Sequence, residues 1–481
     1  MSTRSDLTGL KRDADPVRRP ISCRGRVLRL IVVLMCLPST LIAADAGSGA
    51  DATEDGTSLE SALQESIRLQ EQIARINEQL ADLETRFGPY DPRLLEPLQA
   101  LTDTLLQLRD FDEAGSILER RLQLLRTSQG TRSLEQIPVI GELIANDLER
   151  RDWESVADRF EFIHLLNEQN AGVPPDVVLA SRQDLALWNF AQVYLEPPLQ
   201  RLRHFQDARE LLRDNVEAAE ELYGENSLEL LPWLYQRAVL QYQLVAVVVA
   251  DDELGVSARD DILLVEGRSS ESYLRQGLNL VNRMQEIARY NGDREAEAMA
   301  MILDADFQRL LDLGTAARRY REARDMLVEA GLPENEVEDF FRRPVILPVP
   351  HFHSRLSAAV AYQDSNGFRV MTGDDGEVEL IDLGTFTAWS ESLPFARRPD
   401  LPAATDWLDE ALNYHELELE FSINSRGYTR NPDILDSSTD SARVRRDTRN
   451  ALRDMQFRPS FEGDRWRRVD TVRLRYQVLP D

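Results

Sequence analysis

The chain has 481 residues, of which 42% are hydrophobic, and a formal net charge of −28. This length predicts two to four domains, and the hydrophobic fraction excludes disorder throughout the chain. The 84 acidic residues outnumber the 56 basic ones, so most of the surface should repel nucleic acid and anionic lipid. We therefore expect no nucleic-acid partner.

The first 44 residues have the pattern of a targeting segment. Arginines at positions 18, 19, 24, 26 and 29 precede an apolar run over residues 30–42, which ends before Ala43 and Ala44. A bilayer-spanning helix needs about 20 apolar residues, so this short run favours a cleaved signal peptide over residues 1–44. The predicted location is the periplasm. The alternative is an inner-membrane anchor, the one case in which we expect membrane contact.

Both cysteines, Cys23 and Cys36, lie in this segment. The mature chain is therefore expected to have neither disulfides nor thiolate chemistry. Residues 45–58 are small and polar, which predicts a flexible linker. Residues 59–87 then carry apolar side chains at helical spacing. We interpret this helix as a cap on the following domain, with a dimeric coiled coil as the alternative.

Regular spacing of glycine and aromatic residues indicates an internal repeat. Glycines recur at an interval of 42 residues, at Gly88, Gly130 and Gly172. Phe111 and Trp153 each precede the next glycine by 19 residues. An aromatic residue three positions before an alanine recurs at Phe111, Phe205 and Tyr320, where we expect helices to start and to pack closely. Each unit is interpreted as helix A, a turn, helix B and a terminating glycine.

This arrangement resembles the tetratricopeptide repeat (TPR), in the longer form found in kinesin light chains. The resemblance covers about residues 88–331 and implies five helical hairpins. We therefore predict a mainly α fold, with an N-terminal helix and TPR-like repeats stacked as a solenoid over residues 59–331. An all-helical array without repeat ancestry is the alternative. Both interpretations give a groove for a partner, because one hairpin cannot bury its own apolar face.

The sequence of residues 332–415 predicts a connector that contains a β-hairpin. Prolines at positions 333, 344, 348 and 350 end the helical pattern. Two β-rich runs between Phe368 and Leu383 flank the turn sequence at residues 373–376, which is typical of a hairpin. A short helix is expected over residues 403–413.

Residues 416–481 predict a small α+β domain with the order strand, strand, helix, strand (ββαβ). Alternating side chains indicate strands at residues 416–424 and 470–478. The glycine turn after the first strand, the helix running into Phe457-Arg458-Pro459, Gly463 and the alternating last strand resemble the TonB C-terminal domain. The resemblance implies contact with outer-membrane receptors, often by pairing of strand edges.

One departure from that family concerns force transduction. Members that transduce energy are anchored by a transmembrane helix with a polar face, usually with a histidine, whereas residues 30–44 are short and contain no histidine. The long proline-rich spacer of those proteins is also missing. The resemblance therefore supports a binding role, and an inner-membrane-anchored TonB-family energy transducer is an alternative function.

Candidate partner-binding residues lie on the last strand and on the helix of this domain. In a three-stranded sheet, the strand at residues 470–478 would have a free edge for a partner's strand. Its candidate contacts are Arg473, Arg475 and Tyr476, and Arg445 and Arg449 on the helix form a second candidate surface. The arginines favour an acidic segment of an envelope protein, such as a periplasmic part of an outer-membrane receptor. The alternative is that they pair with acids of the domain itself.

No phosphate-binding loop, dinucleotide fingerprint, nucleophile elbow or zinc-protease motif occurs in the sequence. His351 and His353 could supply half of a metal site, but two imidazoles alone are weak evidence, so we expect no metal and no cofactor. The sequence thus predicts a periplasmic protein–protein interaction scaffold rather than an enzyme. An enzyme with a dispersed site is the second alternative function.

Overall fold

The computed structural model describes residues 54–195, 198–249, 270–372, 378–387, 414–462 and 465–478. The expected signal peptide, residues 45–53 of the expected linker and the expected helix at residues 403–413 lie outside these ranges. Residues 54–58, which we expected to be linker, are helical instead. The chain divides into two compact units, Met1–Ser61 and Ala62–Asp481. In the described ranges, no helix combines the length and the hydropathy that crossing a bilayer requires.

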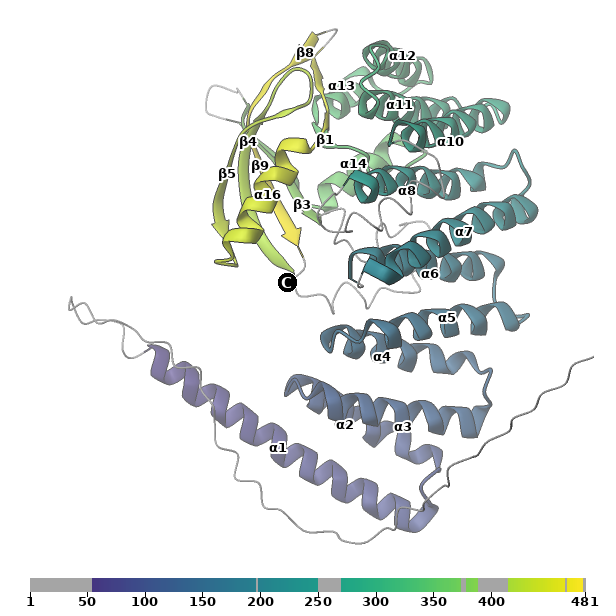
Figure 1. The fold of residues 1–481 in the computed structure, drawn as a ribbon, viewed down its shortest axis with the longest axis vertical. Helices are drawn as coiled ribbons and strands as arrows, with labels where there is room; N and C mark the ends of the chain where they lie inside the picture. Colours follow the sequence, from purple (N-terminus) through teal and green to yellow (C-terminus); the bar gives the residue numbers. More distant parts are fainter. Residues whose placement is uncertain are drawn as a thin grey trace, which may run out of the picture. The chain divides into compact units, whose positions relative to one another are not determined.

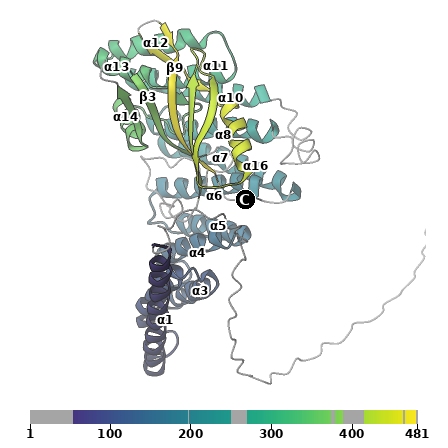
Figure 2. The same ribbon diagram turned by 90° about the vertical axis from the view of Figure 1, so that its left-hand side faces the viewer.

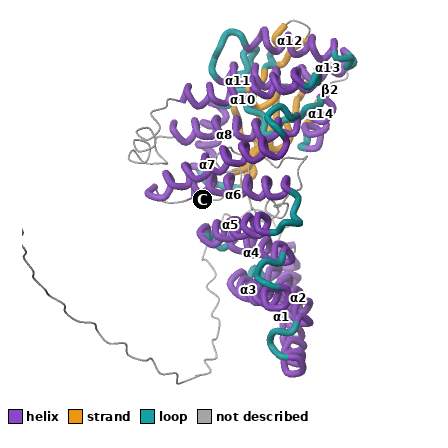
Figure 3. The backbone as a smooth tube through the Cα atoms, turned by 90° about the vertical axis from the view of Figure 1, so that its right-hand side faces the viewer, coloured by secondary structure: helices purple, strands orange, loops and turns teal. Residues whose placement is uncertain are grey.

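The described part of unit Ala62–Asp481 begins with a helix and continues as five helical hairpins (Figures 1 and 3). The long helix is α1 (Glu54–Phe87). The hairpins, each a helix A and a helix B, are α2 (Leu95–Gln107) and α3 (Phe111–Gln129), α4 (Ile137–Glu149) and α5 (Trp153–Gln169), α6 (Pro175–Leu195) and α7 (Pro198–Tyr223), α8 (Leu231–Val249) and α10 (Ser270–Tyr290), and α11 (Arg294–Leu310) and α12 (Ala316–Glu329). The predicted register of helix A, turn, helix B and glycine is confirmed.

A repeated turn joins three of the hairpins to the element before them. Its glycines adopt φ values of +93°, +96° and +92° at Gly88, Gly130 and Gly224. Glycine tolerates this conformation because it has no Cβ atom. The residue three positions after each glycine is the N-cap of a short 3₁₀ helix: Asp91, Ser133 or Ser227. Its side-chain oxygen accepts a hydrogen bond from the backbone N–H of the residue two positions further along the chain. The spacing Gly-x-x-Asp/Ser therefore fixes where helix A begins.

The aromatic–x–x–alanine signature marks close packing more reliably than it marks a helix start. Phe111 opens α3, with Asp110 as its N-cap. By contrast, Phe205 and Tyr320 lie inside α7 and α12, so the predicted helix starts there are wrong. The alanines of the signature are all fully buried, at Ala114, Ala208 and Ala323.

Helix α1 packs on the first hairpin and thus caps the array. Ile76 and Leu80 share a core cluster with Leu98, Leu101 and Leu105 of α2. Arg120 of α3 also forms an ion pair with Glu84. This packing agrees with the interpretation of residues 59–87 as a cap.

The remaining elements include a five-stranded mixed sheet with the strand order β2-β3-β9-β4-β5. Strands β3 and β9, which pair with each other in this sheet, are labelled in Figure 2. In chain order the elements are α13 (Glu334–Arg342), β1 (Val345–Ile346), α14 (Leu356–Ser365), β2 (Phe368–Thr372), β3 (Val378–Thr387), β4 (His415–Ile423), β5 (Thr429–Ser437), α16 (Ala442–Asp454), β6 (Phe457–Arg458), β7 (Ser460–Glu462), β8 (Arg465–Arg467) and β9 (Val469–Val478). The order β4, β5, α16, β9 is the predicted ββαβ pattern.

The predicted hairpin is present, with Phe368 opposite Leu383, but it belongs to the sheet and not to a separate connector. Strand β3 pairs in parallel with β9, which places Ile381 opposite Val472. The expectation of a three-stranded sheet is therefore wrong. Helix α16 lies across one face of this sheet (Figure 1), where Val444 and Leu452 join its core.

The sheet is joined to the last hairpin by a buried ion pair. Nε of Arg458 on β6 donates to Oδ1 of Asp306 on α11 at 3.0 Å, and Nη2 of Arg458 donates to Oδ2 of the same carboxylate at 2.5 Å. The Tyr320 hydroxyl donates to the same carboxylate at 2.6 Å. Burial alone would lower the pKa of Arg458, but the Asp306 carboxylate outweighs it and raises that pKa. The helical array therefore contains a buried carboxylate whose cation comes from the C-terminal region.

Candidate functional site

Strand β9, the expected binding edge, is the central strand of the sheet. It pairs in parallel with β3 on one side and antiparallel with β4 on the other. Arg475, for example, lies opposite Thr385 of β3 and Glu418 of β4. Its backbone hydrogen-bonding groups are therefore engaged on both sides, and a partner's strand cannot add there. The expectation of a free edge at residues 470–478 is wrong because the hairpin β2–β3 occupies it.

The side chains of β9 face charges of their own sheet. Nε of Arg473 donates to Oε2 of Glu420 at 3.1 Å, and Arg473 also lies opposite Asp382. Tyr476 is only 4% exposed, and its ring stacks on that of Phe386 with centroids 5.9 Å apart. Tyr476 therefore contributes to the core rather than to a surface that a partner could contact.

The exposed face beside these arginines is acidic. Glu418 lies opposite Asp436, and Glu420 lies opposite Asp433, so acids of β4 and β5 sit next to each other across the strands. Like charges in such positions repel, and Arg473 relieves part of this repulsion from β9. The sheet face therefore does not have the basic character that we expected for binding an acidic segment.

Arg445 and Arg449 are four residues apart on α16, so they share one side of the helix. Both are partly exposed. Their neighbours Arg443 and Arg446 form ion pairs with Asp447. Arg445 and Arg449 remain candidates for partner contact.

The two edge strands of the sheet differ in how open they are. In β5, Pro432 lacks a backbone donor and Asn431 has a φ of +53°, two features that obstruct the addition of another strand. In β2, Val370 and Met371 are 46% and 47% exposed, and the described strand has no proline. The more open edge is thus β2, which sequence reasoning did not propose.

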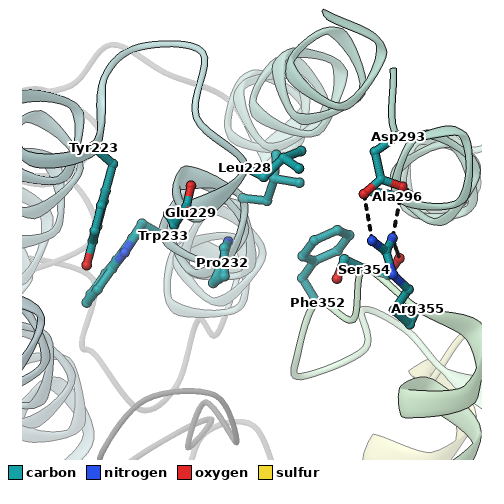
Figure 4. Close-up of a pocket in the computed structure, with 11 residues that line it drawn as sticks. Tyr223, Leu228, Glu229, Pro232, Trp233, Asp293, Ala296, Phe352, Ser354 and Arg355 are labelled. Carbon is teal, nitrogen blue, oxygen red and sulfur yellow. Dashed lines mark hydrogen bonds and ion pairs between the residues drawn. The ribbon is translucent and has the colours of Figure 1, made fainter. Parts of the chain in front are cut away.

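A pocket of about 340 Å³ lies where the turn before α8, the start of α11 and the segment before α14 meet (Figure 4). Aromatic and apolar side chains form much of its lining, together with a few polar ones. The lining residues are Tyr223, Leu228, Glu229, Leu231, Pro232, Trp233, Asp293, Ala296, Phe352, Ser354 and Arg355. The lining therefore combines apolar walls with charged and polar groups, a combination that can orient a bound ligand.

One wall of the pocket is a bidentate ion pair. Nη1 of Arg355 donates to Oδ1 of Asp293 at 2.9 Å, and Nη2 donates to Oδ2 at 2.8 Å (Figure 4). Glu295 lies 3.6 Å from the same guanidinium. The hydrogen bond from Arg355 is the largest cause that lowers the pKa of Asp293. Oδ1 of Asp293 also accepts from the backbone N–H of Ala296, so the pair is fixed to the N-terminus of α11.

A second carboxylate, Glu229, lines the same pocket from the repeated turn before α8. The hydroxyl of Ser227 donates to its Oε2. This hydrogen bond, followed by one from its own backbone N–H, lowers the pKa of Glu229, so the side chain is ionised at neutral pH. Among the residues that the structure describes, no ion pair involves Glu229.

Sequence reasoning did not find this pocket, because its walls come from three segments that are far apart in the chain. The available signal was local: Gly224 followed by Ser227 and Glu229 repeats the turn spacing of Gly130, Ser133 and Glu135. That spacing predicts a capped turn with an outward carboxylate. It does not reveal that Phe352 and Arg355 lie opposite.

The two histidines singled out in the sequence line a smaller, mostly apolar cavity of about 70 Å³. The rings of His351 and His353 lie 4.8 Å and 5.2 Å from that of Tyr362, measured between centroids. In the described part of the chain, no group of three or more His, Cys, Asp or Glu side chains could hold a metal ion. Arg458, the partner of Asp306, also lines this cavity.

Comparison with known proteins gives likenesses to solved structures. No family model matches the sequence, and no curated protein matches it. One similar structure is a protein from Podosopora anserina described as a kinesin light chain with nearly identical TPR-like repeats; identity is 14%, the TM-score is 0.28, and the match covers 49% of this chain and 93% of that one. Another is BtubC from P. vanneervenii, with 16% identity, a TM-score of 0.27 and coverage of 55% and 93%. At such TM-scores the likeness carries no argument, so the repeat fold rests on the hairpins themselves.

Proposed function

We propose that this chain is an exported, periplasmic protein–protein interaction scaffold that catalyses no reaction of its own. The observation that carries the proposal is the contrast between the first and the last A helices. On α11, every residue from Ala296 to Gln308 is buried, partly by the chain's own C-terminal domain. On α2, Asp103 is exposed and Gln99 partly so.

The exposed A-helix side chains are joined across hairpins. Nε2 of Gln99 donates to Asp103 at 2.7 Å and to Glu142 of α4 at 3.4 Å. Glu142 in turn accepts from Arg121 of α3. A polar stripe therefore runs from α2 to α4, which is the arrangement that lets a repeat array bind an extended partner.

The C-terminal domain completes the proposed scaffold as a second docking module. Its ββαβ order supports a TonB-like assignment, and Arg445 and Arg449 supply a partly exposed basic side on α16. The partner that we propose is an envelope protein, for example a periplasmic segment of an outer-membrane receptor. No cofactor is needed for this role.

The binding surface can be tested by site-specific photo-crosslinking in intact cells. A photoreactive amino acid at Asp103, on the A-helix stripe, should yield an adduct with an envelope protein. The matched control is Gln123, which is exposed on the neighbouring B helix and should yield none. Equal adducts at both positions, or none at either, would contradict the proposal.

Export is tested by determining the mature N-terminus by mass spectrometry after cell fractionation. We expect a chain that starts near Asp45 in the periplasmic fraction. An intact N-terminus in the membrane fraction would instead support the anchored energy transducer.

A further inference from the structure

The pocket of Figure 4 combines aromatic walls with a carboxylate that no described cation neutralises. Tyr223, Trp233 and Phe352 line it, and Glu229 stands at its edge on the turn before α8 (Figure 4). Glu229 is solvent-exposed, so a ligand that enters from solution can reach it without displacing core side chains.

The opposite wall already holds a cation of the chain itself. The guanidinium of Arg355 is bound by both oxygens of Asp293 and lies beside Glu295. This positive charge is therefore compensated twice within the wall. The wall therefore has no positive charge in excess, and Glu229 adds a further negative charge to the pocket.

Such a combination fits a basic side chain. A guanidinium or ammonium group is attracted to the faces of aromatic rings within about 6 Å, and a carboxylate supplies charge-assisted hydrogen bonds to it. The aliphatic stem of arginine or lysine can cover apolar surface such as that of Leu228 and Pro232. The net charge of −28 further draws basic segments toward the chain.

We propose that this pocket binds an arginine or lysine side chain of the partner polypeptide. The inference rests on the scaffold function proposed above and specifies the chemistry of one contact. A basic side chain enters between the aromatic walls, and its cationic group reaches Glu229 while the Asp293–Arg355 pair stays intact.

The test measures binding of short peptides to the full mature chain by isothermal titration calorimetry at low salt. Three acetylated and amidated pentapeptides differ only in the central residue, which is arginine, citrulline or glutamate. Citrulline has nearly the shape of arginine but no charge. We expect the arginine peptide to bind about tenfold more tightly than the citrulline peptide, with an affinity that falls as salt is added.

Two variants locate the binding. Glu229→Gln keeps the size of the side chain and removes its charge, so the arginine peptide should lose about tenfold in affinity. The matched control is Glu225→Gln, since Glu225 is exposed on the same turn but does not line the pocket. It should leave the affinity unchanged, and circular dichroism should show that both variants are folded.

The outcomes separate this inference from the scaffold proposal. Equal binding of the arginine and citrulline peptides, or an unchanged affinity in Glu229→Gln, would overturn the basic-side-chain pocket. Tighter binding of the glutamate peptide would overturn it in favour of an anion at Arg355. If the arginine peptide binds as expected while crosslinking at Asp103 finds nothing, the pocket stands and the A-helix stripe fails.

Discussion

At the scale of single residues, the Asp306–Arg458 pair is the contact whose loss should matter most. Both side chains are almost fully buried, at 1% and 3% exposure. Arg458→Ala leaves the carboxylate without its cation in an apolar surrounding, which should lower the free energy of unfolding by about 3–5 kcal/mol. Urea unfolding followed by circular dichroism measures this loss.

Arg445→Ala is the control for that experiment, because its side chain is partly exposed on α16 and the change should cost less than about 0.5 kcal/mol. A second comparison removes both charges, with Asp306→Leu and Arg458→Met together. Since no charge is then stranded, the double variant should be more stable than Arg458→Ala alone. Equal loss in all three variants would show that the pair is not what joins the two regions.

The Asp293–Arg355 pair should make stability depend on pH. The pKa of Asp293 is lowered by Arg355, so the folded state favours the ionised carboxylate. The resulting stabilisation is present above the usual carboxyl pKa of about 3.9 and is lost as the pH falls further. Arg355 is 47% exposed, so Arg355→Gln should cost only about 0.5–1 kcal/mol at pH 7.

Urea midpoints at pH 7 and pH 3 check this expectation. The difference between wild type and Arg355→Gln should shrink at the lower pH, because the stabilisation by the ionised Asp293 carboxylate decreases once the pH falls below the usual carboxyl pKa. Arg86→Gln serves as the comparison, because its ion pair with Asp82 has both side chains 61% exposed. A difference that grows at pH 3 would rule out the proposed linkage.

At the scale of elements, the turn between hairpins depends on backbone conformation rather than on packing. Gly130 has a φ of +96°, and an added Cβ would meet no atom within 4 Å. Gly130→Ala should therefore destabilise the array by about 1 kcal/mol through backbone strain alone. Gly172→Ala is the matched control: it also has open space but is not among the glycines with positive φ. Thermal unfolding of both variants tests the difference, and equal melting temperatures would contradict it.

The helical hairpins could be predicted because their signals are local. Glycine spacing, N-cap residues and buried alanines all act within one turn or one helix pair. They indicate the order of helix A, turn and helix B over residues 88–331, although two of the predicted helix starts are wrong. The ββαβ order of residues 416–478 was equally accessible, because alternation of side chains is a property of each strand by itself.

The partners of those strands could not be predicted from local patterns. The parallel pairing of Ile381 with Val472 joins residues that are far apart in sequence. The residue pattern of either strand does not indicate that the other is its partner. As a result, local sequence patterns wrongly predict β9 as an edge strand. The pocket shares this difficulty, since Trp233 and Phe352 come from separate regions. For the buried ion pair a signal did exist: Asp306 stands in a stretch of α11 that is otherwise largely apolar.

At the scale of the whole molecule, the last hairpin and the sheet should unfold as one unit. Without residues 332–481, α11 would expose Met299, Ile302 and the Asp306 carboxylate, all now buried. In a fragment of residues 59–331, hydrogen exchange should become faster in α11 and α12, because buried helices lose protection when their cover is removed. Helices α2 to α5 of the same fragment should exchange as in the full chain. Unchanged protection in α11 would show that the sheet is dispensable for the array.

The position of β9 in the sheet has a consequence for biosynthesis. The hairpins β2–β3 and β4–β5 both precede β9 in the chain, yet each borders it in the sheet. As a ribosome releases the chain, two separate ribbons therefore emerge first, each with an unpaired edge where β9 will later lie. Residues 469–478 close the sheet when they arrive, so a premature stop before Val469 leaves both ribbons apart and exposes them to proteases and to aggregation.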